Sequence, residues 1–273
     1  MISIDTGTEE LICKIENRVA TVTLNKPHKK NALGDVLTPA LRKTIAILDD
    51  DDRVGCVLIT GAGDAFCAGG DVSGMGSGTK KNLDTPSSKQ EKIDTLVEKQ
   101  KTLTNRIYEA NKVTIAAMPG AAAGAGLSIA LACDLRVASD NAFITTAFGN
   151  IGLSGDYGAS WFLPRLIGLA KAKELFYTGD RVLASECERL GIINKVFPKE
   201  SFSKDAQSYA AKVANGPVNA FGRMKKNLHS GMDQSLEDSL RLEAIHLIES
   251  MNDPESKEAI QAFMEKRKPV FRE

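Results

Sequence analysis

The segment VTIAAMPGAAAGAGLSIALACDLRVAS, residues 113–139, carries the pattern that decides the fold. It begins as an apolar run typical of a buried strand and passes through a turn of glycine and alanine. It then continues as a helix of small residues and returns to a strand pattern. Similar alternation recurs along the chain. The sequence therefore predicts an α/β fold in which helices cover repeated strand units.

The residues before this segment extend the alternation. Residues 9–27 predict two short strands joined by a turn at residues 16–18. Residues 32–51 have apolar side chains at helical spacing and end in an acidic run. Residues 54–63, VGCVLITGAG, predict a buried strand that stops at glycines. Strands and helices thus alternate from the start of the chain.

Two further segments have a different composition. Residues 74–105 are polar and predict a loop leading into an amphipathic helix, as either a solvated insertion or a lid over a pocket. From about Ser201 the chain is rich in helix formers at helical spacing. We therefore expect a core over residues 1–200 and a helical C-terminal subdomain over residues 201–273.

Composition restricts the function classes. Lys plus Arg and Asp plus Glu both total 35, so no broad field favours nucleic acid or an anionic membrane. The sequence contains no run of about 18 apolar residues, so we expect no transmembrane span. The first residues lack the pattern of a secretory or organellar leader. The five cysteines have no CxxC spacing, which favours reduced core thiols over disulfides or a metal site. We expect a cytoplasmic protein without a metal.

Two glycine-rich turns follow buried-strand patterns, DAFCAGGDV at residues 64–72 and PGAAAGAGLSIA at residues 119–130. Glycine and alanine allow a ligand to approach the backbone, and amides at the start of a helix carry partial positive charge. Two such turns could direct two N–H groups at one oxygen atom, although GAAAGAG could equally let a helix pack tightly on a sheet. Neither turn matches the dinucleotide fingerprint or a P-loop.

Five separated motifs resemble the crotonase superfamily, the enoyl-CoA hydratases and isomerases. They are NKPHKKNAL, FCAGGDV, PGAAAGAGLSIALACDLRVAS, IGLSGDYGASWFLPRLIG and AKELFYTGDRVLASECERLGIINKVFP, spread over roughly residues 10–200. The resemblance implies a crotonase-like spiral of ββα units with a helical C-terminal part. It also implies homotrimers or dimers of trimers, and an acyl-CoA thioester as substrate. No separate cofactor is implied, because CoA is part of the substrate.

In the family, two main-chain N–H groups hold the thioester oxygen, and by resemblance these belong to Gly70 and Ala125. This assignment agrees with the two glycine-rich turns, and losing one such donor typically costs about 2.7–4 kcal/mol of barrier. Basic residues of the NKPHKKNAL and MEKRKP motifs are candidates for the CoA phosphates, with one subunit reaching the ligand of its neighbour, and a solvated basic face explains them nearly as well. The full set of expected substrate contacts is Lys29, Ala68, Phe148, Tyr157, Trp161 and Lys266.

The catalytic acids depart from the family pattern. Enoyl-CoA hydratases carry two glutamates, and the matching positions here hold Ser128 and Phe148. Hydration needs a base that activates water and an acid that delivers a proton. Phe148 can do neither, so two-glutamate hydratase chemistry is disfavoured.

Asp156, in IGLSGDYGASW, matches the position at which single-acid enoyl-CoA isomerases and ring-epoxide isomerases place their carboxylate. One carboxylate suffices to remove a proton from C2 of a 3-enoyl thioester and return it to C4. Apolar neighbours such as Phe148 and Trp161 would exclude water and raise the pKa of the acid. The competing interpretation is that Asp156 caps the helix that follows it.

Other functions remain open at this stage. A hydratase or other lyase with an unconventional acid would need water in the pocket, and a non-catalytic acyl-CoA-binding member could have lost both glutamates. RNA binding is disfavoured by the balanced charge. A dehalogenase would need a histidine and a tryptophan that this chain lacks at the matching positions. Asp71 is expected to anchor its own turn, and the histidines, His28, His229 and His246, are expected to have surface or core roles.

Overall fold

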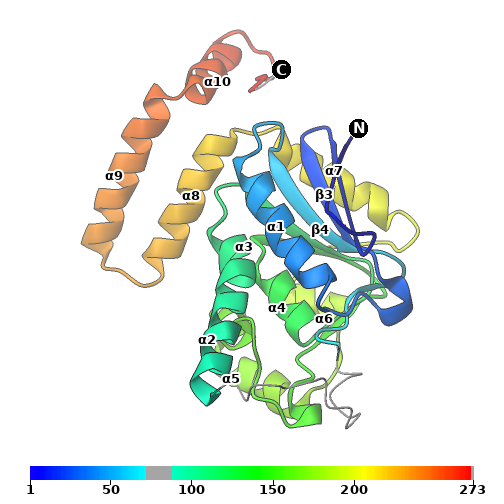
Figure 1. Ribbon diagram of the computed structural model, residues 1–273. Helices are drawn as coiled ribbons and strands as arrows, with labels where there is room; N and C mark the ends of the chain where they lie inside the picture. Colours follow the sequence, from blue (N-terminus) through cyan, green and yellow to red (C-terminus); the bar gives the residue numbers. More distant parts are fainter. Residues whose placement is uncertain (72–87, 272–273) are drawn as a thin grey trace.

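The computed structural model describes residues 1–71 and 88–271, and its strands form two sheets (Figure 1). In this part of the chain the larger sheet has seven strands in the order β1-β2-β3-β4-β6-β8-β11, and the smaller has four in the order β10-β9-β7-β5. The strands of the larger sheet are β1 (Ile2–Ile4), β2 (Leu11–Glu16), β3 (Val19–Leu24), β4 (Cys56–Gly61), β6 (Val113–Met118), β8 (Leu135–Ser139) and β11 (Lys195–Phe197). Those of the smaller are β5 (Ala65–Cys67), β7 (Ala121–Ala123), β9 (Phe143–Thr145) and β10 (Val182–Leu183).

The two sheets are built from a repeated unit. In each of the pairs β4–β5, β6–β7 and β8–β9, the first strand lies in the larger sheet and the next strand joins the smaller one. From β3 to β11 the larger sheet is parallel, and β5, β7 and β9 are parallel to each other. Helices follow these pairs along the chain. The predicted α/β spiral of ββα units is confirmed.

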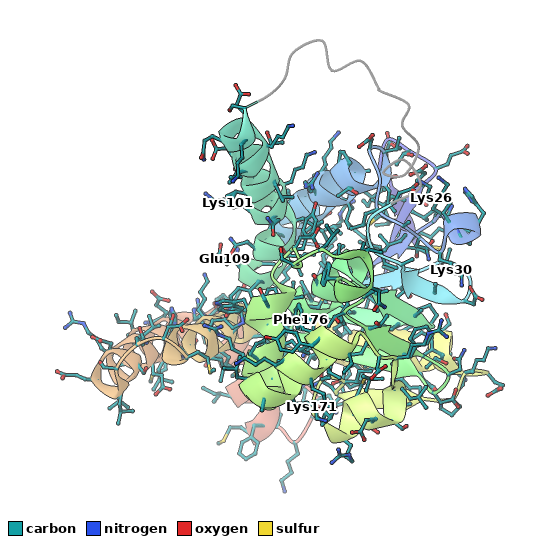
Figure 2. All side chains as sticks on the ribbon, turned by 90° about the horizontal axis from the view of Figure 1, so that it is seen from below. Lys26, Lys30, Lys101, Glu109, Lys171 and Phe176 are labelled. Atoms are coloured by element: carbon teal, nitrogen blue, oxygen red, sulfur yellow. The ribbon has the colours of Figure 1, made fainter. Side chains whose placement is uncertain are left out.

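Helices cover the sheets and extend beyond them. They are α1 (Leu37–Asp50), α2 (Lys89–Gln100), α3 (Arg106–Glu109), α4 (Ala125–Ala132), α5 (Ala159–Thr178), α6 (Ala184–Arg189), α7 (Phe202–Ala214), α8 (Val218–Gly231), α9 (Leu236–Asn252) and α10 (Pro254–Met264). Short 3-10 turns lie at η1 (Pro27–Lys29) and η4 (Gly149–Ile151), and a π-helix, η3 (Lys101–Asn105), continues α2. In Figures 1 and 2, α9 projects away from the body of the molecule with side chains along its length. No helix within the described ranges is long and apolar enough to cross a membrane.

Two apolar clusters hold these layers together. The main cluster joins both sheets to α1 and α4, with fully buried side chains such as Leu24, Ile59 and Phe66. The second joins the larger sheet to α7 and includes Leu58 and Phe202. The helix α7 follows the expected boundary at residue 200 and packs on the sheet, so the division of the chain at that residue stays a prediction.

Several local predictions can be compared with the structure. The turn between β2 and β3 places Asn17 and Arg18 at φ values of 48° and 64°, as the hairpin pattern predicts. The helix expected in residues 74–105 is α2 with η3, and the loop expected before it falls largely in residues 72–87, outside the described residues. The turn predicted after β6 contains a further short strand, β7, which pairs with β5 and β9.

Candidate active site

The two glycine-rich turns pack directly against each other. A Cβ atom at Gly120 would lie 1.9 Å from the carbonyl oxygen of Asp64, and one at Gly126 would lie 2.3 Å from that of Cys67. No side chain fits at these distances, so glycine is required at both positions. This contact brings the end of β5 against the start of α4.

The two turns carry the main-chain N–H groups of Gly70 and Ala125. A bridge between Leu33 and Gly70 uses the carbonyl of Gly69 and the N–H of Asp71, at 2.7 and 2.9 Å, and does not use the N–H of Gly70. Ala125 is the first residue of α4, so its N–H has no acceptor inside the helix. A Cβ at Gly69 would lie 3.4 Å from the Ala125 nitrogen, which shows how closely the two turns approach.

Asp156 lies in a strained turn just before α5. Gly155, Tyr157 and Gly158 all have positive φ, and Tyr157 does so without being glycine. The N-cap of α5 is Gly158, and no side chain caps this helix. The competing interpretation of Asp156 as the helix cap is therefore wrong.

One oxygen atom of the Asp156 carboxylate meets no hydrogen-bond partner among the described residues. This atom, Oδ1, is buried and accepts no hydrogen bond from any residue in the described ranges. Burial raises the pKa of this carboxyl group above its usual range, because desolvation disfavours the charged form. A buried carboxylate oxygen that no described residue engages is available to accept a hydrogen bond or a proton from a ligand.

The peptide group that follows Asp156 is held from two sides. Ser128 Oγ on α4 donates to the carbonyl oxygen of Asp156 at 2.9 Å, and Tyr157 N–H donates to Gln100 Oε1 on α2 at 2.7 Å. Ser128 is fully buried. The position that matches a hydratase glutamate therefore carries a side chain that orients the backbone of Asp156.

Five of the residues expected at the site line one cavity of about 550 Å³, namely Lys29, Gly70, Ala125, Asp156 and Tyr157. The cavity is lined further by α1, α2 and the loops after β3 and β5. The other lining residues are Lys26, Leu33, Gly34, Asp35, Thr38, Pro39, Arg42, Asp71 and Lys99. Arg42 and Lys99 were not expected from the sequence.

Charged pairs surround the cavity. Lys29 Nζ lies 2.8 Å from Asp71 Oδ2, and Lys26 Nζ lies 3.5 Å from Glu10 Oε1. The pair with Lys29 links the loop after β3 to the loop after β5. The expected role of Asp71 as the anchor of its own turn stays a prediction.

The remaining expected contacts do not line this cavity within the single chain. The ring of Phe148 is buried against Gly155 and stacks on Phe176, with ring centroids 6.2 Å apart. Ala68 follows β5, and Lys266 follows α10. A role for any of these residues toward substrate stays a prediction.

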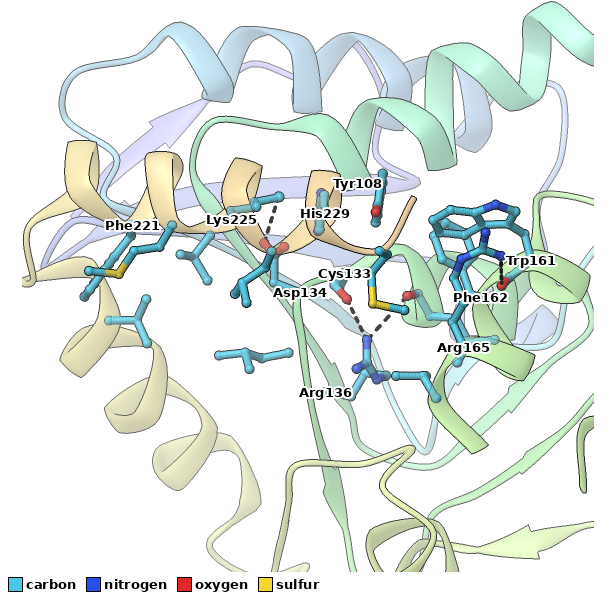
Figure 3. Close-up of a pocket in the computed structure, with 18 residues that line it drawn as sticks. Tyr108, Cys133, Asp134, Arg136, Trp161, Phe162, Arg165, Phe221, Lys225 and His229 are labelled. Carbon is cyan, nitrogen blue, oxygen red and sulfur yellow. Dashed lines mark hydrogen bonds and ion pairs between the residues drawn. The ribbon is translucent and has the colours of Figure 1, made fainter. Parts of the chain in front are cut away.

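Trp161 lines a different cavity, of about 560 Å³, between α5 and α8 (Figure 3). Its ring contacts Tyr108 and Phe162 edge to face, and Arg165 stacks over it at 3.7 Å. It does not line the cavity that holds Asp156, but it lines a further one together with Tyr157, and its expected role in shielding the acid stays a prediction. His229 stacks on Tyr108 in the same cavity and has the core role expected of it.

Comparison with known proteins supports the resemblance to the enoyl-CoA hydratases and isomerases. Residues 14–273 match the family described as Enoyl-CoA hydratase/isomerase. The "Probable enoyl-CoA hydratase" of Rhodobacter capsulatus is 35% identical over 94% of this chain and 96% of its own length. The "1,2-epoxyphenylacetyl-CoA isomerase" of Escherichia coli is 32% identical over 96% of this chain and 98% of its own length. The crystal structure of an enoyl-CoA hydratase from Polaromonas superposes with a TM-score of 0.86, at 31% identity, over 95% of this chain and 98% of that one.

The spiral of ββα units and the cavity with its two turns define a crotonase-type enzyme that acts on acyl-CoA thioesters. The match extends over nearly the whole of each compared chain. This chain belongs to the enoyl-CoA hydratase/isomerase family. The names of the relatives include both hydratases and isomerases, so membership establishes the class of reaction and leaves the choice between the two to the site.

Proposed function

We propose that this enzyme is an acyl-CoA isomerase in which Asp156 is the only acid and base. The observation that carries the proposal is the buried Oδ1 atom of Asp156, which has no partner among the described residues and lines the cavity that also holds Gly70 and Ala125. A general base must reach a proton of the substrate, and no described residue engages this buried oxygen.

The proposed reaction moves a double bond from C3 to C2 of the acyl group. Asp156 removes a proton from C2 of a 3-enoyl thioester, and the electron pair delocalises into the thioester to form a dienolate. The N–H groups of Gly70 and Ala125 hold the dienolate oxygen. The carboxyl group then returns the proton to C4, which leaves a conjugated 2-enoyl thioester. Atoms balance without water or a cofactor.

The same machinery supports rearrangement of a ring-derived CoA ester, because that reaction also needs one acid and a stabilised enolate. The printed name of the E. coli relative, a 1,2-epoxyphenylacetyl-CoA isomerase at 32% identity, supports naming this reaction as the second candidate. A hydratase with an unconventional acid is less well supported. Ser128 already donates to a backbone carbonyl, and Phe148 is apolar, so neither position offers a second acid.

The test is a diode-array assay of wild type and Asp156→Asn with 3-hexenoyl-CoA and crotonyl-CoA. We expect 3-hexenoyl-CoA to gain thioester conjugation, crotonyl-CoA to stay unhydrated, and the Asn variant to lose at least about a hundredfold in rate. Because the carboxylate is the active base, kcat/KM should rise with pH through a pKa above the ordinary carboxyl range.

Asp180→Asn is the matched control, since Asp180 is exposed and lies outside the cavity. It should retain wild-type activity. Hydration of crotonyl-CoA by the wild type at a rate that Asp156→Asn leaves unchanged would contradict the proposal.

The proposal also includes the oligomeric state, the CoA contacts and the cellular location of the enzyme. We expect Lys29, and Lys266 from a neighbouring subunit, to contact CoA phosphates in a homotrimer or dimer of trimers. Exposed apolar side chains along α8 to α10 support such an assembly, and the five buried, unpaired cysteines support a reducing, cytoplasmic setting.

A further inference from the structure

Arg42 lies on the wall of the catalytic cavity with a charge that no described carboxylate balances. Its Nη2 donates to Tyr157 Oη at 3.1 Å, and its Nε donates to the carbonyl oxygen of Lys99 at 3.2 Å. Both acceptors are neutral. No ion pair joins Arg42 to an acid within residues 1–71 and 88–271, whereas Lys26 and Lys29 in the same cavity each have one. The guanidinium has more N–H donors than these two bonds use.

The hydroxyl group of Tyr157 also has unused capacity. Its oxygen accepts from Arg42, and none of the described residues accepts the hydroxyl proton. A phenol can donate one hydrogen bond while it accepts another. Burial raises the pKa of Tyr157, so the proton stays on the oxygen at neutral pH. The pair therefore presents hydrogen-bond donors and no acid to the cavity.

The backbone holds Tyr157 in place for this contact. Its φ of 53° is unfavourable for a bulky residue, and the hydrogen bond from its N–H to Gln100 maintains it. Arg42 and Tyr157 are 115 positions apart in sequence, yet both line the cavity with Asp156. Tyr157 thus has a strained backbone, lies next to the proposed base and accepts a hydrogen bond from an arginine that has no acidic partner among the described residues. Core packing alone does not require this arrangement.

We propose that Arg42 and Tyr157 recognise an oxygen atom on the acyl group of the substrate. The preferred substrate is then an acyl-CoA thioester that carries a hydroxyl, ether, carbonyl or carboxylate oxygen beyond the carbons that exchange the proton. This inference rests on the proposed function, because it places the acyl group beside Asp156. An aliphatic chain would leave the two donor groups desolvated and unpaired, which disfavours it.

The test compares three acyl groups of equal length. These are 3-hexenoyl-CoA, 6-hydroxy-3-hexenoyl-CoA and the CoA monothioester of 3-hexenedioic acid, which end in a methyl, a hydroxyl and a carboxylate group. Wild type should favour at least one oxygen-bearing substrate over 3-hexenoyl-CoA by about tenfold or more in kcat/KM, as expected for a hydrogen bond to a charged or buried group. Tyr157→Phe should reduce that ratio for the hydroxyl substrate, and Arg42→Met should reduce it for the carboxylate.

Tyr177→Phe and Arg189→Met are matched controls, because both residues are exposed and lie outside the cavity. Their ratios should equal the wild-type ratio. Equal kcat/KM for the three substrates in the wild type would overturn the inference. So would variants at Arg42 and Tyr157 that lower all three values by the same factor, since the pair would then serve folding or CoA binding.

Failure of the proposed function is measured separately. Calorimetry of the unreactive hexanoyl-CoA, 6-hydroxyhexanoyl-CoA and adipic acid CoA monothioester reports acyl recognition without turnover. If wild type isomerises nothing but binds an oxygen-bearing ester about tenfold more tightly, the inference stands and the isomerase proposal fails. If isomerase activity is present and the three esters bind equally, the isomerase proposal stands and the inference fails.

Discussion

Substitution of Ser128 tests whether this residue positions Asp156 for catalysis or only stabilises the fold. Its Oγ donates to the Asp156 carbonyl, whereas Ser139, also buried, donates to the side chain of Asn141 away from the cavity. Ser128→Ala and Ser139→Ala should each lower the free energy of unfolding by about 1 kcal/mol, the usual net worth of a hydrogen bond. Only Ser128→Ala should also lower kcat for 3-hexenoyl-CoA, by about tenfold with little change in KM, because misplacing a catalytic group slows chemistry. Equal kcat values in the two variants would show that Ser128 has no positioning role.

Individual site residues could be predicted from the sequence where they belong to a recognisable motif. They could not be predicted where they meet their partner only through the fold, far apart in sequence. Gly70, Ala125 and Asp156 were predicted from their motifs, and the cavity brings them together. Arg42 was missed because it lies in an ordinary helical pattern and meets Tyr157 only in the fold. Trp161 was expected to help exclude water from the acid, and in the fold its ring meets Tyr108 edge to face outside the cavity that holds Asp156.

Among the elements, α8 is tied to the sheet by one buried ion pair. Lys225 Nζ lies 2.9 Å from Asp134 Oδ2 (Figure 3). The same oxygen accepts from the N–H and the hydroxyl of Thr114. Lys225→Met should lower the free energy of unfolding by about 3 kcal/mol, because it leaves a largely buried carboxylate without its cation. Urea unfolding measures this loss. The neighbouring, exposed Lys226→Met should change stability by less than about 0.5 kcal/mol, and equal losses in both variants would contradict the assigned role of the pair.

Helices and strands with a long periodic pattern of apolar residues could be predicted from the sequence, whereas a short strand without such a pattern could not. The hairpin of β2 and β3 and the helix α1 follow clear alternating and helical periods. The strand β7 consists of Ala121 to Ala123, which lack the β-branched side chains typical of strands. It forms because β5 and β9 pair with it on both sides. Such a strand depends on its tertiary neighbours, so no local pattern reveals it.

For the whole molecule, the exposed apolar surface of the last helices predicts self-association. Side chains such as Ile260 and Phe263 on α10 are 62% and 82% exposed, and α9 carries several more at similar exposure. An apolar surface of this extent is unusual for a monomer. The family resemblance implies trimers or dimers of trimers, so light scattering after size exclusion should give a mass near three or six times the 29.3 kDa of the chain. Glutamate at both Ile260 and Phe263 should reduce that mass, since charge is depleted in the core of an interface.

Lys43→Glu, on the exposed side of α1, is the control for added negative charge and should leave the mass unchanged.

The double variant at Ile260 and Phe263 also tests whether a neighbouring subunit contributes to substrate binding. Lys266 follows α10 and does not line the cavity of its own chain, so any contact it makes with CoA would come from assembly. Dissociated subunits should then show a raised KM for acyl-CoA with kcat nearly retained, because Asp156 and both N–H donors lie within one chain. A wild-type mass of a single chain would contradict the prediction of assembly and leave Lys266 without access to the substrate.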